Sequence, residues 1–86
     1  MQQTFTVEDI IAFIHWQASL TRDSDIMGGE AVFPNSRLSV RHVGGMLERG
    51  ERSAVILEDY PYLSERDLMF AHLYVKVYSQ LNEVFN

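Results

Sequence analysis

Turn-forming residues divide the stretch from Ser24 to Val75 into short segments, and this feature constrains the fold more than any other. A Gly-Glu break at Gly50 and a Tyr-Pro-Tyr-Leu turn at Pro61 separate runs that have helical apolar spacing. Compact helices joined by short turns are typical of a helix-turn-helix domain. We therefore predict a mainly α fold with a helix-turn-helix core.

The segment before this core predicts an N-terminal helix over 7–19 with Thr6 as its cap. Apolar residues occupy two faces of this helix: Val7, Ile10, Ile11, Ile14 and Ala18 form one, and Phe13, Trp16 and Leu20 form the other. A helix that is apolar on two sides packs against two things. We expect one of them to be its own domain and the other to be a second chain.

A small β-hairpin is predicted next. Residues 21–30 are polar and contain glycines, which predicts a loop. A β-prone run over 31–33, the turn pair Pro34-Asn35 and the alternation over 36–39 then predict two short strands. A two-stranded hairpin is barely stable alone, so it should pack on helices or pair with another chain.

Three further helices are predicted, over 40–49, 52–59 and 65–84. Ser39 can cap the first of them, and Ser64 with Asp67 resembles a capping box at the start of the last. The pair Gly44-Gly45 lowers helix stability by up to about 1 kcal/mol per residue relative to alanine. We interpret these glycines as small residues that permit a close helix crossing.

The 86 residues make a single domain, which we divide into an N-terminal helix (1–20), the core (24–78) and a C-terminal helix end (79–86). A domain of this size buries only roughly 60–65% of the surface its unfolded chain exposes. The terminal helices also carry more apolar surface than one small core can use, so we expect a homodimer. The predicted partner or dimer interface consists of Phe13, Trp16, Phe70, Leu73, Tyr74, Val77 and Leu81.

Composition argues against several classes of function. The chain has no cysteine, and His15, His42 and His72 lack the i, i+4 spacing of metal ligands. No nucleophile, phosphate-loop or dinucleotide motif is present, so we expect no enzyme, no cofactor and no metal site. No run reaches the ~18 apolar residues of a membrane span. The acidic start is unlike a signal peptide, so we expect a cytoplasmic protein without membrane contact.

Basic residues suggest an alternative to protein binding. Five arginines between positions 37 and 66 are candidate DNA contacts: Arg37, Arg41, Arg49, Arg52 and Arg66. A net charge of −5 opposes binding to a duplex, as do Glu65 and Asp67 in the first turn of the last helix. Two roles are open for Arg37. It could contact a phosphate or a carboxylate of a partner, or it could act as a structural clamp that binds helix-end carbonyls or Glu58-Asp59. We favour the clamp.

Three motifs occur in a fixed order: GGEAVFPNSRLSV at 28–40, the Gly50-Glu51 break and ILEDYPYL at 56–63. They resemble those of a small prokaryotic family labelled as a domain of unknown function, number 433. Its members typically show Gly-Gly-x-Pro-Val-φ-x-Gly-Thr-Arg-φ-x-Val. This chain departs at Ala31, where proline is usual, and at Asn35-Ser36, where Gly-Thr is usual. The resemblance covers 21–75.

The resemblance implies a homeodomain-like helical domain with a small β element. Some relatives look like antitoxins paired with PIN-type ribonuclease toxins. Acidic charge and apolar terminal helices also suit protein binding. We therefore expect an antitoxin-like interaction protein that binds and restrains a protein partner. The alternative is a dimeric helix-turn-helix regulator that binds operator DNA.

Overall fold

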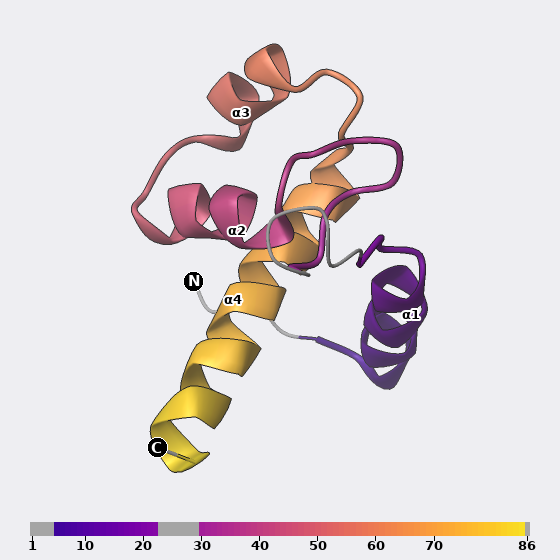
Figure 1. Cartoon of the computed structure of the whole chain (residues 1–86), viewed down its shortest axis with the longest axis vertical. Coiled ribbons are helices and arrows are strands. Elements are labelled where there is room, and N and C mark those ends of the chain that lie inside the picture. The colour runs from indigo at the N-terminus through magenta and orange to yellow at the C-terminus, as the bar shows by residue number, and fades with distance from the viewer. Residues whose placement is uncertain (1–4, 23–29, 86) are drawn as a thin grey trace.

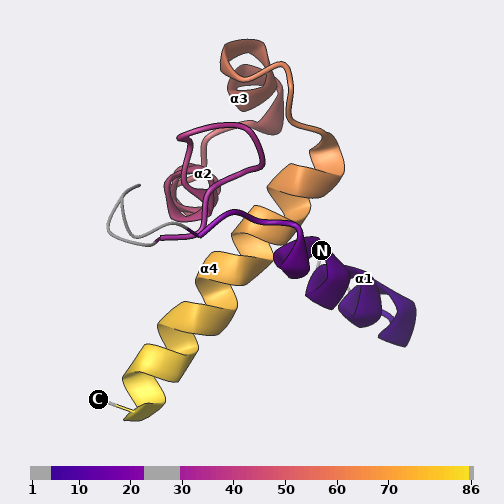
Figure 2. The same cartoon turned by 45° about the vertical axis from the view of Figure 1, so that its right-hand side comes forward.

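A computed structural model describes residues 5–22 and 30–85. Within these residues the chain forms four helices: α1 (Val7–Ala18), α2 (Val40–Glu48), α3 (Ser53–Asp59) and α4 (Glu65–Phe85). The longest helix, α4, is central, with α1 and α2 on opposite sides of it and α3 near its N-terminal end (Figures 1 and 2). The mainly helical class is confirmed. The homeodomain-like arrangement of these helices stays a prediction.

Side-chain caps fix where three of the helices begin. Thr6 and Asp9 form a capping box at α1, in which each side chain accepts a hydrogen bond from the other's backbone N–H. The Ser39 hydroxyl accepts from the His42 N–H at 3.0 Å at the start of α2. Ser64 and Asp67 repeat the reciprocal pattern at α4. The predicted caps are therefore all present.

The expected hairpin over 31–33 and 36–39 is reduced to isolated bridges. Val32 pairs antiparallel with Ser39 on one side and with Thr21 on the other. Asn35 takes a φ of 58° in the turn, in keeping with its tolerance of the left-handed region. Val32 therefore lies between two backbone segments and forms a single bridge with each of them. The described part of the chain has no regular strand pair here. The contribution of Thr21 was not predicted.

Gly44 lets α2 cross α4 closely. A Cβ at this position would collide with the backbone carbonyl oxygen of Ala71 and with the side chain of Val75, both on α4. A Cβ on Gly45 would meet only the end of the Arg49 side chain, at 3.3 Å. The predicted close crossing is thus correct for Gly44, whereas Gly45 has no such requirement.

The core lies where α2, α4 and the segment with the β-bridges, residues 31–39, meet. Its fully buried large side chains are Val32, Phe33, Val40, Val43, Ile56, Leu68 and Phe70. Phe13 of α1 joins this cluster, with its ring centroid 5.5 Å from that of Phe70. The buried polar side chain of Ser39 is satisfied by its cap, so the cap also removes a desolvation cost.

Candidate functional site

The outward face of α1 exposes large apolar side chains to solvent. Val7, Ile10, Ile11 and Ile14 are 76%, 44%, 50% and 57% exposed. They follow the i, i+3, i+4, i+7 spacing and therefore form one stripe along the helix. Contiguous exposed apolar residues of this kind mark interaction sites more often than isolated ones do. The prediction of a second apolar face on this helix is confirmed.

The opposite face of α1 is attached to the body through an aromatic cluster. Trp16 packs against Phe33 and Phe70, with ring centroids 6.1 and 5.5 Å away. Its indole Nε1–H donates to Asp67 Oδ1 at 2.9 Å, and the Tyr78 hydroxyl donates to Gln17 at 2.9 Å. These contacts set the rotation of α1 about its axis, and so they direct the apolar stripe away from the core.

The C-terminal half of α4 is a second exposed element. Beyond the bond from Tyr78 to α1, the helix extends away from the rest of the chain (Figures 1 and 2). Val77 is 36% exposed on this part, next to exposed Lys76. The sequence continues the spacing of Val77 with Leu81 and Val84. A helix end of this composition can bind an apolar groove on another protein.

The predicted interface residues fall into four groups. Phe13, Phe70 and Tyr74 are buried within the chain, so they offer a partner almost no surface. Trp16 and Leu73 are partly buried and pack against the same core. Val77 is exposed, and the side chain of Leu81 lies outside what the structure describes. The stripe on α1 therefore replaces the buried aromatics as the candidate interface, and the dimer itself stays a prediction.

Tyr74 shows why an apolar pattern alone misplaces such residues. Tyr74 is 5% exposed, and its hydroxyl accepts a hydrogen bond from Arg22 Nη2 at 2.9 Å. Arg22 lies 52 positions earlier in the chain, so the residues around Tyr74 in the sequence do not predict this hydrogen bond. Asp67 is similar, because the residue expected to repel phosphate instead binds the Trp16 indole and caps α4.

All five candidate DNA-binding arginines are exposed: Arg37, Arg41, Arg49, Arg52 and Arg66. Their charges are not gathered into one unopposed patch. The Nε of Arg41 lies 3.3 Å from a carboxylate oxygen of Glu30. Arg66 stacks over the ring of Phe70, with its guanidinium carbon 5.3 Å from the centroid.

The turn between α2 and α3 mixes both signs of charge. Arg49 and Arg52 alternate there with exposed Glu48 and Glu51. Neighbouring charges of opposite sign largely cancel each other's field, and salt screens what remains beyond about one Debye length, about 8 Å at physiological ionic strength. This turn is therefore a weak source of attraction for a polyanion.

Arg37 does not form the expected clamp within the described residues. Its side chain is exposed, and no hydrogen bond or ion pair joins it to Glu58, Asp59 or any other residue of 5–22 and 30–85. It lines an open hollow with Thr21, Asn35 and Ser36. The Ser36 hydroxyl braces the turn in its place, donating to the Phe33 carbonyl and accepting from the Leu38 N–H.

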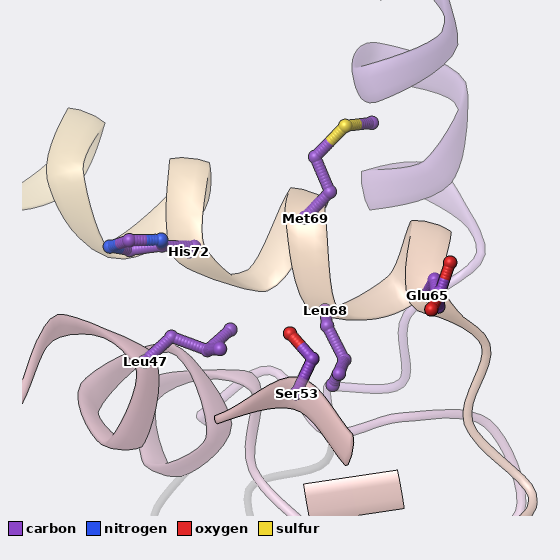
Figure 3. A pocket seen from close by; sticks show the side chains of 6 residues that line it. All are labelled: Leu47, Ser53, Glu65, Leu68, Met69 and His72. Atoms are coloured by element: carbon purple, nitrogen blue, oxygen red, sulfur yellow. The ribbon is translucent and has the colours of Figure 1, made fainter. Parts of the chain in front are cut away.

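A pocket of about 330 Å³ lies between α2, α3 and α4. Leu47, Ser53 and Leu68 point toward one another across it, with Glu65 and His72 at its sides (Figure 3). His72 Nε2 is 2.6 Å from Glu48 Oε2, and this pair links α4 to α2.

Neither a cluster of metal-ligating side chains nor a membrane-spanning helix occurs within the described residues. Within 5–22 and 30–85, no three histidine or carboxylate side chains come together to hold a metal ion. No helix in the same residues combines the length and the apolar character needed to cross a bilayer.

A family model matches most of the chain. The model described as "Protein of unknown function (DUF433)" matches residues 20–75. The matched segment begins after α1 and ends within α4, so both exposed apolar elements lie outside it. Neither a curated protein nor a solved structure matches the chain.

Proposed function

Since this chain belongs to the DUF433 family of proteins of unknown function, we propose its role from its own surfaces: it is an antitoxin-like protein that binds and restrains a protein partner. The observation that carries this proposal is the projecting end of α4. It extends past the family-matched segment and presents exposed Val77 on a stripe that the sequence continues through Leu81 and Val84.

Charge favours a particular class of partner. The chain carries a net charge of −5, and such a field attracts a basic protein and accelerates the encounter. A ribonuclease presents basic surface because it must bind RNA phosphates. A small RNA-cleaving protein with an apolar groove therefore fits both the charge of this chain and its exposed helix end. A cytoplasmic location belongs to the same proposal.

The test uses the proteins encoded next to this chain. Each is co-expressed with it, and the complex is measured by size exclusion with light scattering and by the RNA-cleaving activity of the neighbour. We expect one neighbour to co-elute and to lose its activity. If neither neighbouring product binds, the antitoxin-like role is wrong.

A matched pair of variants locates the contact. Val77→Asp places a charge on the stripe, and Ser79→Asp places the same charge on the opposite side of the same helical turn, at an exposed residue. We expect Val77→Asp to weaken the complex at least tenfold and Ser79→Asp to leave it unchanged. Equal effects from the two variants would remove α4 from the interface.

Binding of operator DNA is a second proposal, favoured by one observation. All five candidate arginines are exposed, and one of the two carboxylates expected to oppose a duplex, that of Asp67, is occupied by hydrogen bonds within the chain. The mixed charges of the α2–α3 turn and the net charge place this proposal second.

A further inference from the structure

The apolar stripe of α1 is self-complementary. Its four large side chains stand at positions 7, 10, 11 and 14, which are symmetric about the midpoint between Ile10 and Ile11. A second α1 laid antiparallel in this register places Val7 opposite Ile14 and Ile10 opposite Ile11, with each pair repeated by the two-fold axis. A two-fold interface requires such a match of a surface to itself.

The polar side chains beside the stripe fit the same arrangement, because a carboxylate accepts a hydrogen bond from an imidazole N–H. Glu8 and His15 are exposed and seven residues apart, so both lie on one flank of the stripe, at its two ends. An antiparallel two-fold pairing reverses the helix direction and keeps like flanks together. Glu8 of one copy therefore comes beside His15 of the second copy, and the reciprocal pair forms at the other end. The two helix dipoles are antiparallel in this arrangement, so the ends of opposite partial charge lie next to each other.

From this symmetry and the pattern of polar side chains we propose that the outward face of α1 is the homodimer interface, and that its occupant is α1 of a second copy in antiparallel orientation. The interface is independent of the projecting end of α4, which stays available to a different protein. It also lies outside the family-matched segment, so it is a property of this chain's own N-terminal helix.

The size of the face sets the expected affinity. A helix of 12 residues is about 18 Å long, and one face of it buries less than the ~800 Å² per partner of a standard stable interface. Small interfaces of this kind belong to weak complexes. We expect a dissociation constant on the order of micromolar, so that the chain is dimeric at high micromolar concentration and dissociates on dilution.

The first experiment measures mass by light scattering after size exclusion over a range of concentrations. Ile11→Asp places a charge at the centre of the stripe, and we expect it to give the monomer mass at every concentration. Val55→Asp is the matched control, because Val55 is also exposed, at 39%, but lies on α3 away from α1 (Figures 1 and 2). Thermal melting confirms that both variants fold. A monomeric unmodified chain, or a dimeric Ile11→Asp variant, overturns the proposal.

The second experiment tests the antiparallel direction. Glu8→Lys places Lys beside His15 and removes the carboxylate acceptor, whereas His15→Glu places Glu beside Glu8 and creates repulsion. Each variant alone should dimerise at least several-fold more weakly than the unmodified chain. Mixed together they should form a heterodimer, because Lys at 8 then faces Glu at 15 and the other end keeps the original pair. A mixture no stronger than its components would exclude this orientation.

These outcomes are separable from those of the proposed function. Val77→Asp should leave the dimer mass unchanged, and Ile11→Asp should still bind the partner through α4. Loss of the dimer with retained partner binding refutes only the α1 interface. A retained dimer with no partner refutes only the antitoxin-like role.

Discussion

The family-matched segment and the helices that flank it differ in what their apolar residues do. Within residues 20–75, most large apolar side chains are buried in the core. At Gly44 a larger residue would collide with α4, because there is no room for a Cβ. In the flanks, the outer face of α1 and Val77 of α4 keep large apolar side chains exposed to water. The matched segment supplies most of the buried core, whereas the flanking helices leave large apolar side chains exposed.

The comparison has exceptions on both sides. Val55 and Tyr62 of the matched segment are 39% and 59% exposed, and Phe13 and Trp16 of the flank pack into the core. The difference therefore lies between faces of helices as well as between stretches of sequence. α1 belongs to both classes, because one of its sides completes the aromatic cluster and the other remains uncovered.

The largest effect is expected at the α2–α4 crossing. Gly44→Ala forces a methyl group against the Ala71 carbonyl and the Val75 side chain, and overpacking of this kind costs about 1–3 kcal/mol. Gly45→Ala is the control, because alanine gains up to about 1 kcal/mol of helix propensity and meets only a movable arginine end. Thermal denaturation should show a lower midpoint for Gly44→Ala and an equal or higher one for Gly45→Ala. Equal losses in both would show that the two helices do not cross as closely as Gly44 indicates.

A smaller loss is expected where α1 joins the body. Trp16→Phe keeps most of the aromatic packing and removes the hydrogen bond to Asp67, so we expect a loss of about 1–2 kcal/mol. The bond is only partly buried, which holds the value below that of a buried charged pair. Chemical denaturation measures the change. If stability is unchanged, α1 is attached by packing alone.

Ser64→Ala separates the two roles of Asp67. It removes one half of the capping box and leaves the indole bond in place, so the expected cost is about 1 kcal/mol. A double variant of Ser64→Ala with Trp16→Phe should lose nearly the sum of the two costs if the cap and the indole bond act independently.

The helices could be predicted from the sequence more accurately than their contacts, for a physical reason. Caps and apolar spacing are local, so Thr6, Ser39 and Ser64 are identified as helix starts from their neighbours. The bond from Trp16 to Asp67 joins residues 51 positions apart, and Trp16 therefore resembles a free interface anchor when only the sequence is considered. The bridge from Thr21 to Val32 is missed because an isolated pair has no periodicity to detect. The exposed stripe of α1 is predicted only as one of two apolar faces, since spacing alone does not say which face turns inward.

Almost no effect on folding is expected from the outer face of α1. Ile14→Ala removes a side chain that is 57% exposed, and surface changes of this kind are within about ±0.5 kcal/mol. Alanine also has the higher helix propensity. The melting midpoint at low micromolar concentration should therefore stay nearly constant, while the dimer weakens. A loss comparable with that of Trp16→Phe would show that this face already packs against the chain.

The weakest effect is expected from the arginines of the matched segment, and a strong one would break the comparison. If Arg41 and Arg52 contacted phosphates, affinity for the upstream DNA of the gene would fall with salt at a log–log slope near 0.9 per phosphate neutralised. Replacing both with alanine would then flatten that slope by about one unit for each phosphate that is no longer neutralised. We expect no such change, because Arg41 pairs with Glu30, Arg52 stands beside Glu51, and the chain as a whole carries a charge of −5. A mobility shift that persists at physiological salt without any partner, and that disappears in the double variant, would show that the matched segment binds as well as folds.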